Sequence, residues 1–208
     1  LEIGGGAFTL SRLILKNIAE CSKDKNDMFK NVLPHAINVL CEFIEEKIDF
    51  LVNESHFFKS SFLVNEGFLK LEKFTGMFGI VGLNECVNII MQKEGKNEKY
   101  GYSPEADDLA EEILQFIKNN VDSFKSKYCD CTDNHFAMHA QVGIDLDIGI
   151  SPGARIAIGS EPDLYSHIRH SGRYHKYFRS GVGDIFPFEE TAKKNPKAVV
   201  DIIKGAFR

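Results

Sequence analysis

The sequence predicts an α/β fold, in which long helices alternate with short apolar strands. The clearest observation is at residues 77–90, where an apolar run containing two glycines passes directly into a helical pattern. This is typical of a buried strand that turns into the helix packed against it. Two further apolar runs, residues 136–143 and 154–159, are predicted strands, and the glycines of residues 149–153 supply a turn between them.

The first two thirds of the chain are predicted to be rich in helix. We expect Thr9 or Ser11 to cap a helix that runs to about Cys21, because its apolar residues share one face. A longer helix is predicted over residues 29–51, where apolar residues recur at close to the helical period. Pro34 lies inside this pattern, so it marks either a kink or the first turn of the second half.

The remaining segments are assigned from turn residues and capping signals. Residues 55–68 are dense in aromatics and are interpreted as a loop tucked under the core. A serine followed by a proline and an acid starts a helix near residue 104, which is predicted to continue to about residue 124. We also expect a short helix over residues 162–168, a turn at residues 181–184 and a final helix capped by Asn195.

Composition excludes several classes of protein. The 208 residues include 30 acidic and 25 basic side chains, a formal net charge of -5, and no basic stripe, so nucleic-acid binding is not expected. No apolar run approaches the roughly 20 residues that cross a bilayer, so no membrane association is expected. Five cysteines are too few for a disulfide scaffold, which favours a reducing, cytoplasmic location.

The two ends of the sequence predict that it is part of a longer chain. The sequence begins without a methionine or a basic leader, and it stops inside an amphipathic helical pattern. We therefore expect residues 1–208 to form one partial domain, truncated at both ends.

Glu85 and Cys86 stand at the predicted turn between strand and helix. Cys86 could act as a nucleophile near a helix start, but its place on the apolar side, with Val87 and Ile90, favours packing. A carboxylate is favoured electrostatically in a first helical turn, which already accounts for Glu85. If Glu85 points into the mouth of a barrel, it is a candidate to hold a substrate hydroxyl or to move a proton.

Arg155 and Glu161 belong to the densest polar cluster of the sequence. Arg155 offers a planar fork to a carboxylate or phosphate, and the alternative is a structural ion pair with Glu161. His139 lies in an apolar run, where a hydrogen-bonded core histidine is the favoured interpretation. Three further histidines among basic residues are interpreted as a solvated face: His167, His170 and His175.

A metal site is the other chemistry that the sequence offers. Cys129 and Cys131, followed by His135 and His139, supply soft ligands. Their spacing matches neither a C-x-x-C knuckle nor an H-E-x-x-H helix, so a metal-binding domain that uses Cys129, Cys131 and His135 stays an alternative.

Several stretches in a fixed order carry a resemblance to a known family. They are residues 4–6 with 13–20, 55–58 with 61–67, 77–85, 139–141, 152–155, 161–163, 180–185 and 195–207. In this order they resemble the YjjI family of glycyl radical enzymes, which are relatives of pyruvate formate-lyase and anaerobic ribonucleotide reductase. The resemblance covers nearly the whole chain.

The resemblance implies a segment of a ten-stranded α/β barrel in an anaerobic, cytoplasmic enzyme. In such enzymes an activating enzyme with an iron–sulfur cluster and S-adenosylmethionine installs a backbone glycyl radical. The radical passes to a cysteine, and the resulting thiyl radical abstracts hydrogen from a small-molecule substrate. No cofactor bound by this segment itself is implied, and a homodimer is possible because relatives are often dimers.

The chain also departs from the pattern of the family. No Arg-Val-x-Gly-Tyr-like stretch is present, and the thiyl cysteine is expected upstream of Gly4, so both radical residues are expected outside the chain. The isolated segment is then expected to be inactive, and a non-catalytic binding or structural module is the alternative. The residues expected to face the cavity are Glu85, His139, Arg155 and Glu161, with Glu85 and Arg155 anchoring substrate.

Overall fold

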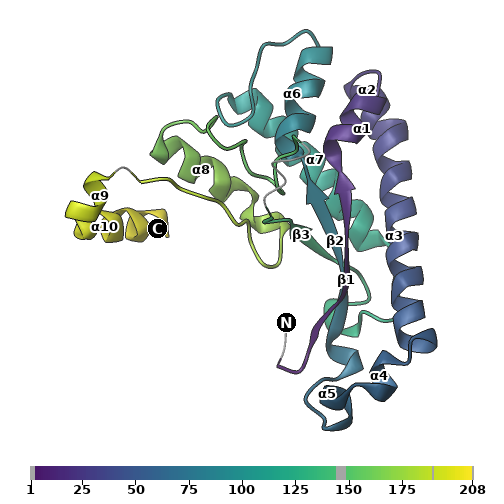
Figure 1. Cartoon of the computed structure of the whole chain (residues 1–208). Coiled ribbons are helices and arrows are strands. Elements are labelled where there is room, and N and C mark those ends of the chain that lie inside the picture. Colours follow the sequence, from purple (N-terminus) through teal and green to yellow (C-terminus); the bar gives the residue numbers. More distant parts are fainter. Residues whose placement is uncertain (1–2, 144–148, 189, 208) are drawn as a thin grey trace.

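The structure, a computed structural model, describes residues 3–143, 149–188 and 190–207 (Figure 1). Within this part of the chain three parallel strands form one sheet in the order β1–β2–β3. They are β1 (Gly6–Ile14), β2 (Phe74–Val81) and β3 (Ala137–Ala140). β1 continues directly into α1 (Leu15–Cys21), whereas β2 passes through Gly82, at a φ of 76°, into α6 (Leu83–Lys93). The predicted α/β class and the strand-to-helix turn at residues 77–90 are confirmed.

Long helices cover one face of the sheet. α3 (Leu33–Asp49) packs on β1 and β2, and α7 (Pro104–Ser123) packs on α3 (Figure 1). Large apolar side chains from the sheet and these helices are fully buried between them: Ile44, Ile48, Phe78, Ile80, Ile113 and Ile117. This apolar layer is the core that holds the sheet and the helices together.

The long N-terminal helix forms largely as predicted. It begins with α2 (Lys25–Asp27), capped by Asp24, and a π-helical turn (Met28–Val32) leads into α3. Pro34 is the second residue of α3 and comes just after the π-helical turn, so it lies in the first turn of the second half of this helical segment. A second π-helical turn (Phe50–Glu54) extends α3 beyond its predicted end.

Two predictions of secondary structure are wrong. The predicted helix ending at Cys21 begins only at Leu15, and residues 9–14 are the last six residues of β1, because parallel pairing with β2 overrides an apolar spacing that suits either element. Residues 154–159 form no strand: the backbone turns at Gly153, where φ is 52°, and only Pro152 makes a bridge, to Val81. Residues 151–156 are nevertheless all buried.

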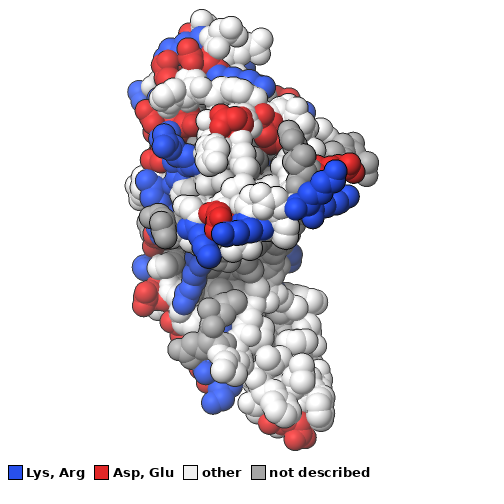
Figure 2. Space-filling model, turned by 90° about the vertical axis from the view of Figure 1, so that its left-hand side faces the viewer, with Lys and Arg blue, Asp and Glu red and all other residues white. Residues whose placement is uncertain are grey.

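The aromatic segment after α3 is not tucked under the core. It forms the short helices α4 (Phe57–Ser60) and α5 (Phe62–Asn65), and Phe62 and Phe68 are more than 60% exposed. Phe58 alone makes ring contacts toward the sheet, to Phe8 and Phe74. On the face that Figure 2 shows, the lower right of the molecule presents mainly uncharged side chains, with acidic side chains at the tip.

The C-terminal region adds helices away from the sheet (Figure 1). Asp163 caps α8 (Leu164–Tyr174), and Asn195 caps α10 (Pro196–Ala206), as predicted, although α8 is longer than expected. Among the described residues, no helix is long and apolar enough to cross a membrane. The remaining short elements are two 3-10 turns before β2 and β3 (Leu71–Lys73 and Asp130–Thr132), one after α8 (His175–Tyr177) and α9 (Thr191–Lys194).

Candidate functional site

Glu85 lies in the first turn of α6, at the carboxyl end of β2. Its carboxylate accepts hydrogen bonds from the backbone N–H of Ser151 at 3.1 Å and from the Ser151 hydroxyl at 2.6 Å. The amide of Asn84 donates a third, at 2.9 Å. The backbone N–H groups of Gly82 and Leu83 donate to the carbonyls of Ser151 and Gly153. Glu85 therefore fastens the segment around Ser151 to the end of β2.

Cys86, the neighbour of Glu85, faces the core. It is fully buried, and its Sγ lies 3.9 Å from Met28 Sδ. Burial, with a smaller contribution from the charge of Glu85, raises the pKa of the Cys86 thiol to about 12. A thiol in this environment stays protonated near neutral pH, so the packing interpretation is confirmed.

Arg155 is buried, with 3% of its surface exposed, and it does not pair with Glu161. Its nearest carboxylate is Asp184, whose Oδ1 lies 3.9 Å from Arg155 Nε. Glu161 instead accepts a hydrogen bond from the Gly159 N–H, at 2.7 Å within its own turn. The alternative of a structural Arg155–Glu161 ion pair is therefore wrong. Arg155 Nη2 is buried and has no hydrogen-bond acceptor within the described part of the chain.

Asp184 is the site residue that sequence reasoning missed. Its Oδ2 accepts hydrogen bonds from the hydroxyl of Ser171 and from His167 Nε2, at 3.0 Å, and its Oδ1 accepts one from the Ile185 N–H. Burial by itself raises the pKa of Asp184, but the hydrogen bonds from His167 and Ser171 outweigh it and the pKa is lowered. The signal in the sequence was an acid directly after a glycine-rich turn, in one of the stretches that carry the family resemblance.

The buried face of α8 is entirely polar or titratable, which overturns the predicted solvated face. His167 and His170 are 2% and 3% exposed, and His175 alone of the three is exposed. His170 Nδ1 lies 3.2 Å from Asp107 Oδ1, and its ring packs on Tyr100. His167 hydrogen-bonds to Asp184, whereas His170 lies near Asp107 without a hydrogen bond from either ring nitrogen. Both carboxylates come from other segments, so the basic neighbours of the histidines in the sequence concealed their burial.

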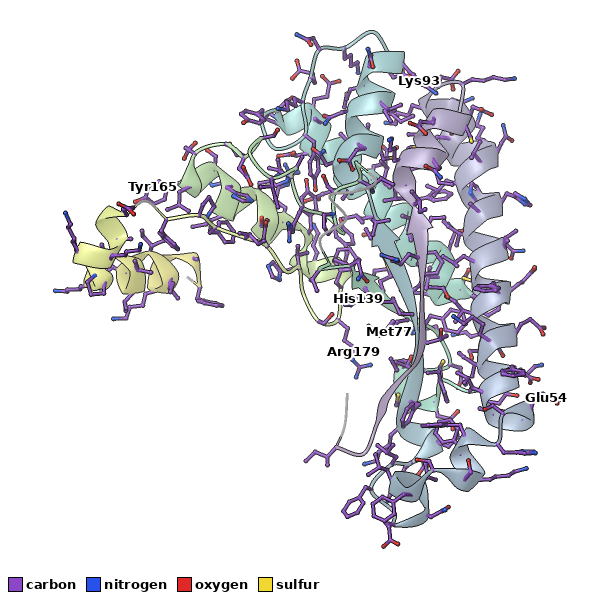
Figure 3. All side chains as sticks on the ribbon, viewed as in Figure 1. Glu54, Met77, Lys93, His139, Tyr165 and Arg179 are labelled. Atoms are coloured by element: carbon purple, nitrogen blue, oxygen red, sulfur yellow. The ribbon has the colours of Figure 1, made fainter. Side chains whose placement is uncertain are left out.

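His139 lies on the face of the sheet that the long helices leave open. Figure 3 shows His139 and Met77 on the side of the sheet away from α3. His139 pairs in register with Gly79, and Gly79 pairs with Arg12, so the three residues form one row across the strands. A side chain at Gly79 would meet Arg12 Cγ at 3.0 Å, so the stem of Arg12 lies over this glycine.

The imidazole of His139 is partly buried and close to a hydroxyl. Its Nδ1 lies 3.5 Å from the Ser180 Oγ. Burial lowers the pKa of His139, which favours the neutral ring at physiological pH. A neutral imidazole at this position can donate one hydrogen bond and accept another.

The predicted site residues do not form one contact network within the described residues. Glu85 and Arg155 contact different ends of the segment of residues 151–155. Glu85 binds its first residue, Ser151, whereas Arg155 is its last residue and lies near Asp184. His139 lies on the open face of the sheet, and Glu161 stabilises a turn.

The cysteines proposed as metal ligands have other partners. Cys129 is buried and its Sγ accepts a hydrogen bond from the Gly76 N–H at 3.2 Å, while Cys131 donates to the Phe74 carbonyl at 3.3 Å. In the described ranges no three side chains of His, Cys, Asp or Glu gather as a metal site would require. The metal-binding alternative thus gains no support from the geometry.

Solved structures with a similar fold include anaerobic ribonucleotide reductases. The enzyme from Thermotoga maritima in complex with dATP and CTP matches with a TM-score of 0.65 and 18% identity, over 94% of this chain and 35% of that one. The same enzyme with citrate in the active site matches with a TM-score of 0.66 and 19% identity, over 95% and 38%. These likenesses show the fold.

Relatives in sequence and a family model give the identity of the chain. The uncharacterized protein YjjI of Escherichia coli K12 is 40% identical over 208 residues, which are all of this chain and 40% of that protein. An uncharacterized protein of Haemophilus influenzae Rd is 43% identical over 206 residues, 98% of this chain and 40% of the relative. The chain thus spans about two fifths of the length of these relatives. The model of the glycyl radical enzyme YjjI-like family matches residues 1–208, and the chain belongs to this family.

Proposed function

We propose that this chain forms part of a glycyl radical enzyme that abstracts hydrogen from a small molecule, and that the open face of its sheet lines the reaction cavity. The observation that carries the proposal is the row Arg12–Gly79–His139, which places polar side chains on the face without helices. If further strands of the whole protein complete a barrel of ten strands, this face of the sheet points into the barrel. Membership of the family supplies the type of reaction.

The radical itself is assigned to residues beyond these 208. Cys41, Cys86 and Cys129 are buried, and Cys131 donates to a backbone carbonyl. Cys21 is exposed at the end of α1, away from the strands. When present, a thiyl radical would take one hydrogen atom from a C–H bond, leaving a thiol and a carbon radical. The role of this chain is to bind and orient the substrate and to exclude water from it.

His139 is the residue that we assign to direct contact with the substrate. Its Nδ1 faces Ser180, so Nε2 is the nitrogen left for a hydroxyl or carbonyl of the substrate. A neutral ring serves this purpose better than a charged one, and burial favours the neutral form by lowering the pKa.

The other predicted site residues receive different roles. Glu85 is proposed as a positioning residue, since Ser151 already occupies both of its oxygens. Arg155 is proposed as a substrate-binding residue, because its guanidinium retains an N–H group without an acceptor among the described residues. Glu161 is proposed to hold the turn at the rim of the site.

The partners of the whole protein follow from the same proposal. We assign to it an activating enzyme that carries an iron–sulfur cluster and S-adenosylmethionine, a cytoplasmic and anaerobic setting, and a homodimeric assembly as a possible form.

The test is to detect the radical. The complete reading frame that contains this chain is incubated anaerobically with its activating enzyme and examined by electron paramagnetic resonance. We expect a glycyl radical signal in the wild type and an equal signal in His139→Ala, because His139 contacts substrate and not the radical glycine. His35→Ala is the matched control, since His35 is exposed on α3. Absence of a signal with an activating enzyme that cleaves S-adenosylmethionine would contradict the proposal.

A further inference from the structure

Two segments without regular secondary structure press against the end of β3. A side chain at Gly153 would lie 2.8 Å from the Gln141 carbonyl oxygen, and one at Gly183 would lie 2.5 Å from Val142 Cγ1. The approach at Gly153 requires glycine, because the neighbouring atom belongs to the backbone and φ is 52°, whereas Gly183 faces the end of an exposed side chain. Arg155 follows the first glycine and Asp184 follows the second, so the two segments bring their charged residues together beside the end of this strand.

Each side of this junction contains a buried polar atom without a partner. Arg155 Nη2 is a donor and Gln141 Oε1 is an acceptor, and neither has a hydrogen bond within the described residues. Asp184 does not accept a hydrogen bond from Arg155. Its oxygens accept from His167, Ser171 and the Ile185 N–H, and the 3.9 Å between Arg155 Nε and Asp184 Oδ1 exceeds hydrogen-bond distance.

Such atoms call for a partner of defined chemistry. A guanidinium keeps its proton and presents its N–H groups in a fixed fork, which suits the oxygens of a carboxylate or phosphate. Buried polar atoms in proteins are nearly always hydrogen-bonded, and exceptions concentrate where a ligand or another group completes the site. A ligand that satisfies both atoms must carry an oxyanion for Arg155 and a hydroxyl for Gln141.

We propose that Arg155 and Gln141 bind a hydroxylated small-molecule oxyanion, either a hydroxycarboxylate or the phosphate ester of a polyol. Arg155 Nη2 donates to the oxyanion, and Gln141 Oε1 accepts from the hydroxyl. The proposal rests on the proposed function, because it identifies the substrate class of the same enzyme. The position is consistent with this role, since ligands of open α/β sheets bind outside the carboxyl ends of the strands.

The segment of residues 182–184, which contains Asp184, also borders a groove. Val182 and Asp184 line a groove of about 700 Å³ between α8 and α10, together with Ser171 and Phe186. Residues 182–184 have no regular secondary structure. We assign access for the ligand to a shift of Val182 and Gly183 toward the groove, while Asp184 keeps its partners on α8.

The test is titration calorimetry of the purified protein with matched probes. Lactate is compared with propionate, which lacks the hydroxyl, and glycerol phosphate with inorganic phosphate and with glycerol, which lacks the oxyanion. We expect saturable binding of lactate or of glycerol phosphate, and the stronger of the two identifies the oxyanion. Loss of one hydrogen bond to a charged group predicts a binding constant about 10- to 100-fold weaker in Arg155→Met.

Two further variants make the test specific. Arg169→Met is the control, because Arg169 is an exposed arginine of α8, and it should bind like the wild type. Gln141→Leu should remove the preference for lactate over propionate while it retains the oxyanion. This variant also decides the question if Arg155→Met fails to fold by circular dichroism.

The outcomes separate this proposal from the function. Unchanged binding in Arg155→Met, an unchanged preference in Gln141→Leu, or no saturable binding of any hydroxylated probe overturns the oxyanion site. A glycyl radical detected in the same preparation would then leave the proposed function intact. Saturable binding of a hydroxylated probe without a glycyl radical signal would support the oxyanion site and contradict the proposed function.

Discussion

The sheet with its covering helices and the region of residues 151–188 differ in what they bury. In the first, Phe78 and Ile80 of β2 meet Ile44 and Ile113 of the helices in a fully apolar layer. The second adds Ile156 and Phe178 to the apolar core, but it also buries carboxylates, histidines and an arginine beside them. The face that α8 buries consists of two histidines, a serine and a tyrosine.

This difference separates scaffold from site. Apolar burial is non-directional, so it gives a stable layer that tolerates small shifts. A buried polar network requires each donor to meet an acceptor, so it fixes residues such as Asp184 in one arrangement. In this network Arg155 Nη2 still lacks an acceptor within the described chain. A buried polar network with such a gap is expected where a ligand binds and not where stability alone is needed.

The largest effect is expected in the apolar layer. Phe78→Ala should lower the free energy of unfolding by about 3–5 kcal/mol, because it removes a fully buried ring and leaves a cavity. Urea denaturation measures the change. Phe43→Ala is the matched control, since Phe43 on α3 is 52% exposed, and its effect should be much smaller. Equal losses in the two variants would contradict the assignment of the core.

A smaller and more local effect is expected in the polar region. Asp184→Ala should cost about 1–3 kcal/mol, because His167 and Ser171 lose their buried acceptor. Amide hydrogen exchange should accelerate in α8 and stay slow in β2. Asp201→Ala, on the exposed side of α10, should change neither. Faster exchange throughout the sheet would show that the two regions are one cooperative unit.

The stability of the polar region around α8 should depend on pH, unlike that of the apolar layer, because it rests on the Asp184 carboxylate. The pKa of Asp184 is lower in the folded protein than in the unfolded chain, so its contribution is present above about pH 4. The contribution is lost as the pH falls further, through the folded pKa. The protection of the α8 amides, taken as the intrinsic rate of exchange at each pH divided by the observed rate, should therefore fall below about pH 4 in the wild type. In Asp184→Asn this fall in protection should be absent, and its persistence would assign the effect to another carboxylate.

The scaffold was predictable from the sequence, with one error at its first strand. Local periodicity identified α3, α6, α7 and the strand at residues 77–81, because each buries one regular face. It misassigned β1, since Leu10, Leu13 and Ile14 suit a helix as well as a strand and only pairing with β2 distinguishes them. The run at residues 154–159 was wrongly predicted to be a strand because its start is buried and apolar. The backbone turn at Gly153 directs it away from the sheet, and no local pattern in the sequence shows this.

The candidate site was predictable only in part. Glu85 was placed correctly at the strand-to-helix turn, but its partner Ser151 is 66 residues away, and no local pattern announces that contact. Asp184, His167 and Arg155 meet from three separate segments, so their burial depends on tertiary structure. Arg12 was overlooked because its segment was taken for a helix, which concealed the row that it forms with Gly79 and His139.

The most direct test of the central claim is hydrogen exchange into the substrate. The activated enzyme is incubated in D₂O with an anaerobic metabolite extract, and mass spectrometry detects deuterium on carbon. A thiol exchanges its hydrogen with solvent, so reversible abstraction labels the substrate. We predict labelling of a hydroxylated oxyanion by the wild type and by His35→Ala, and its loss in His139→Ala at an equal radical signal. Undiminished labelling by His139→Ala would contradict the placement of the open sheet face in the reaction cavity.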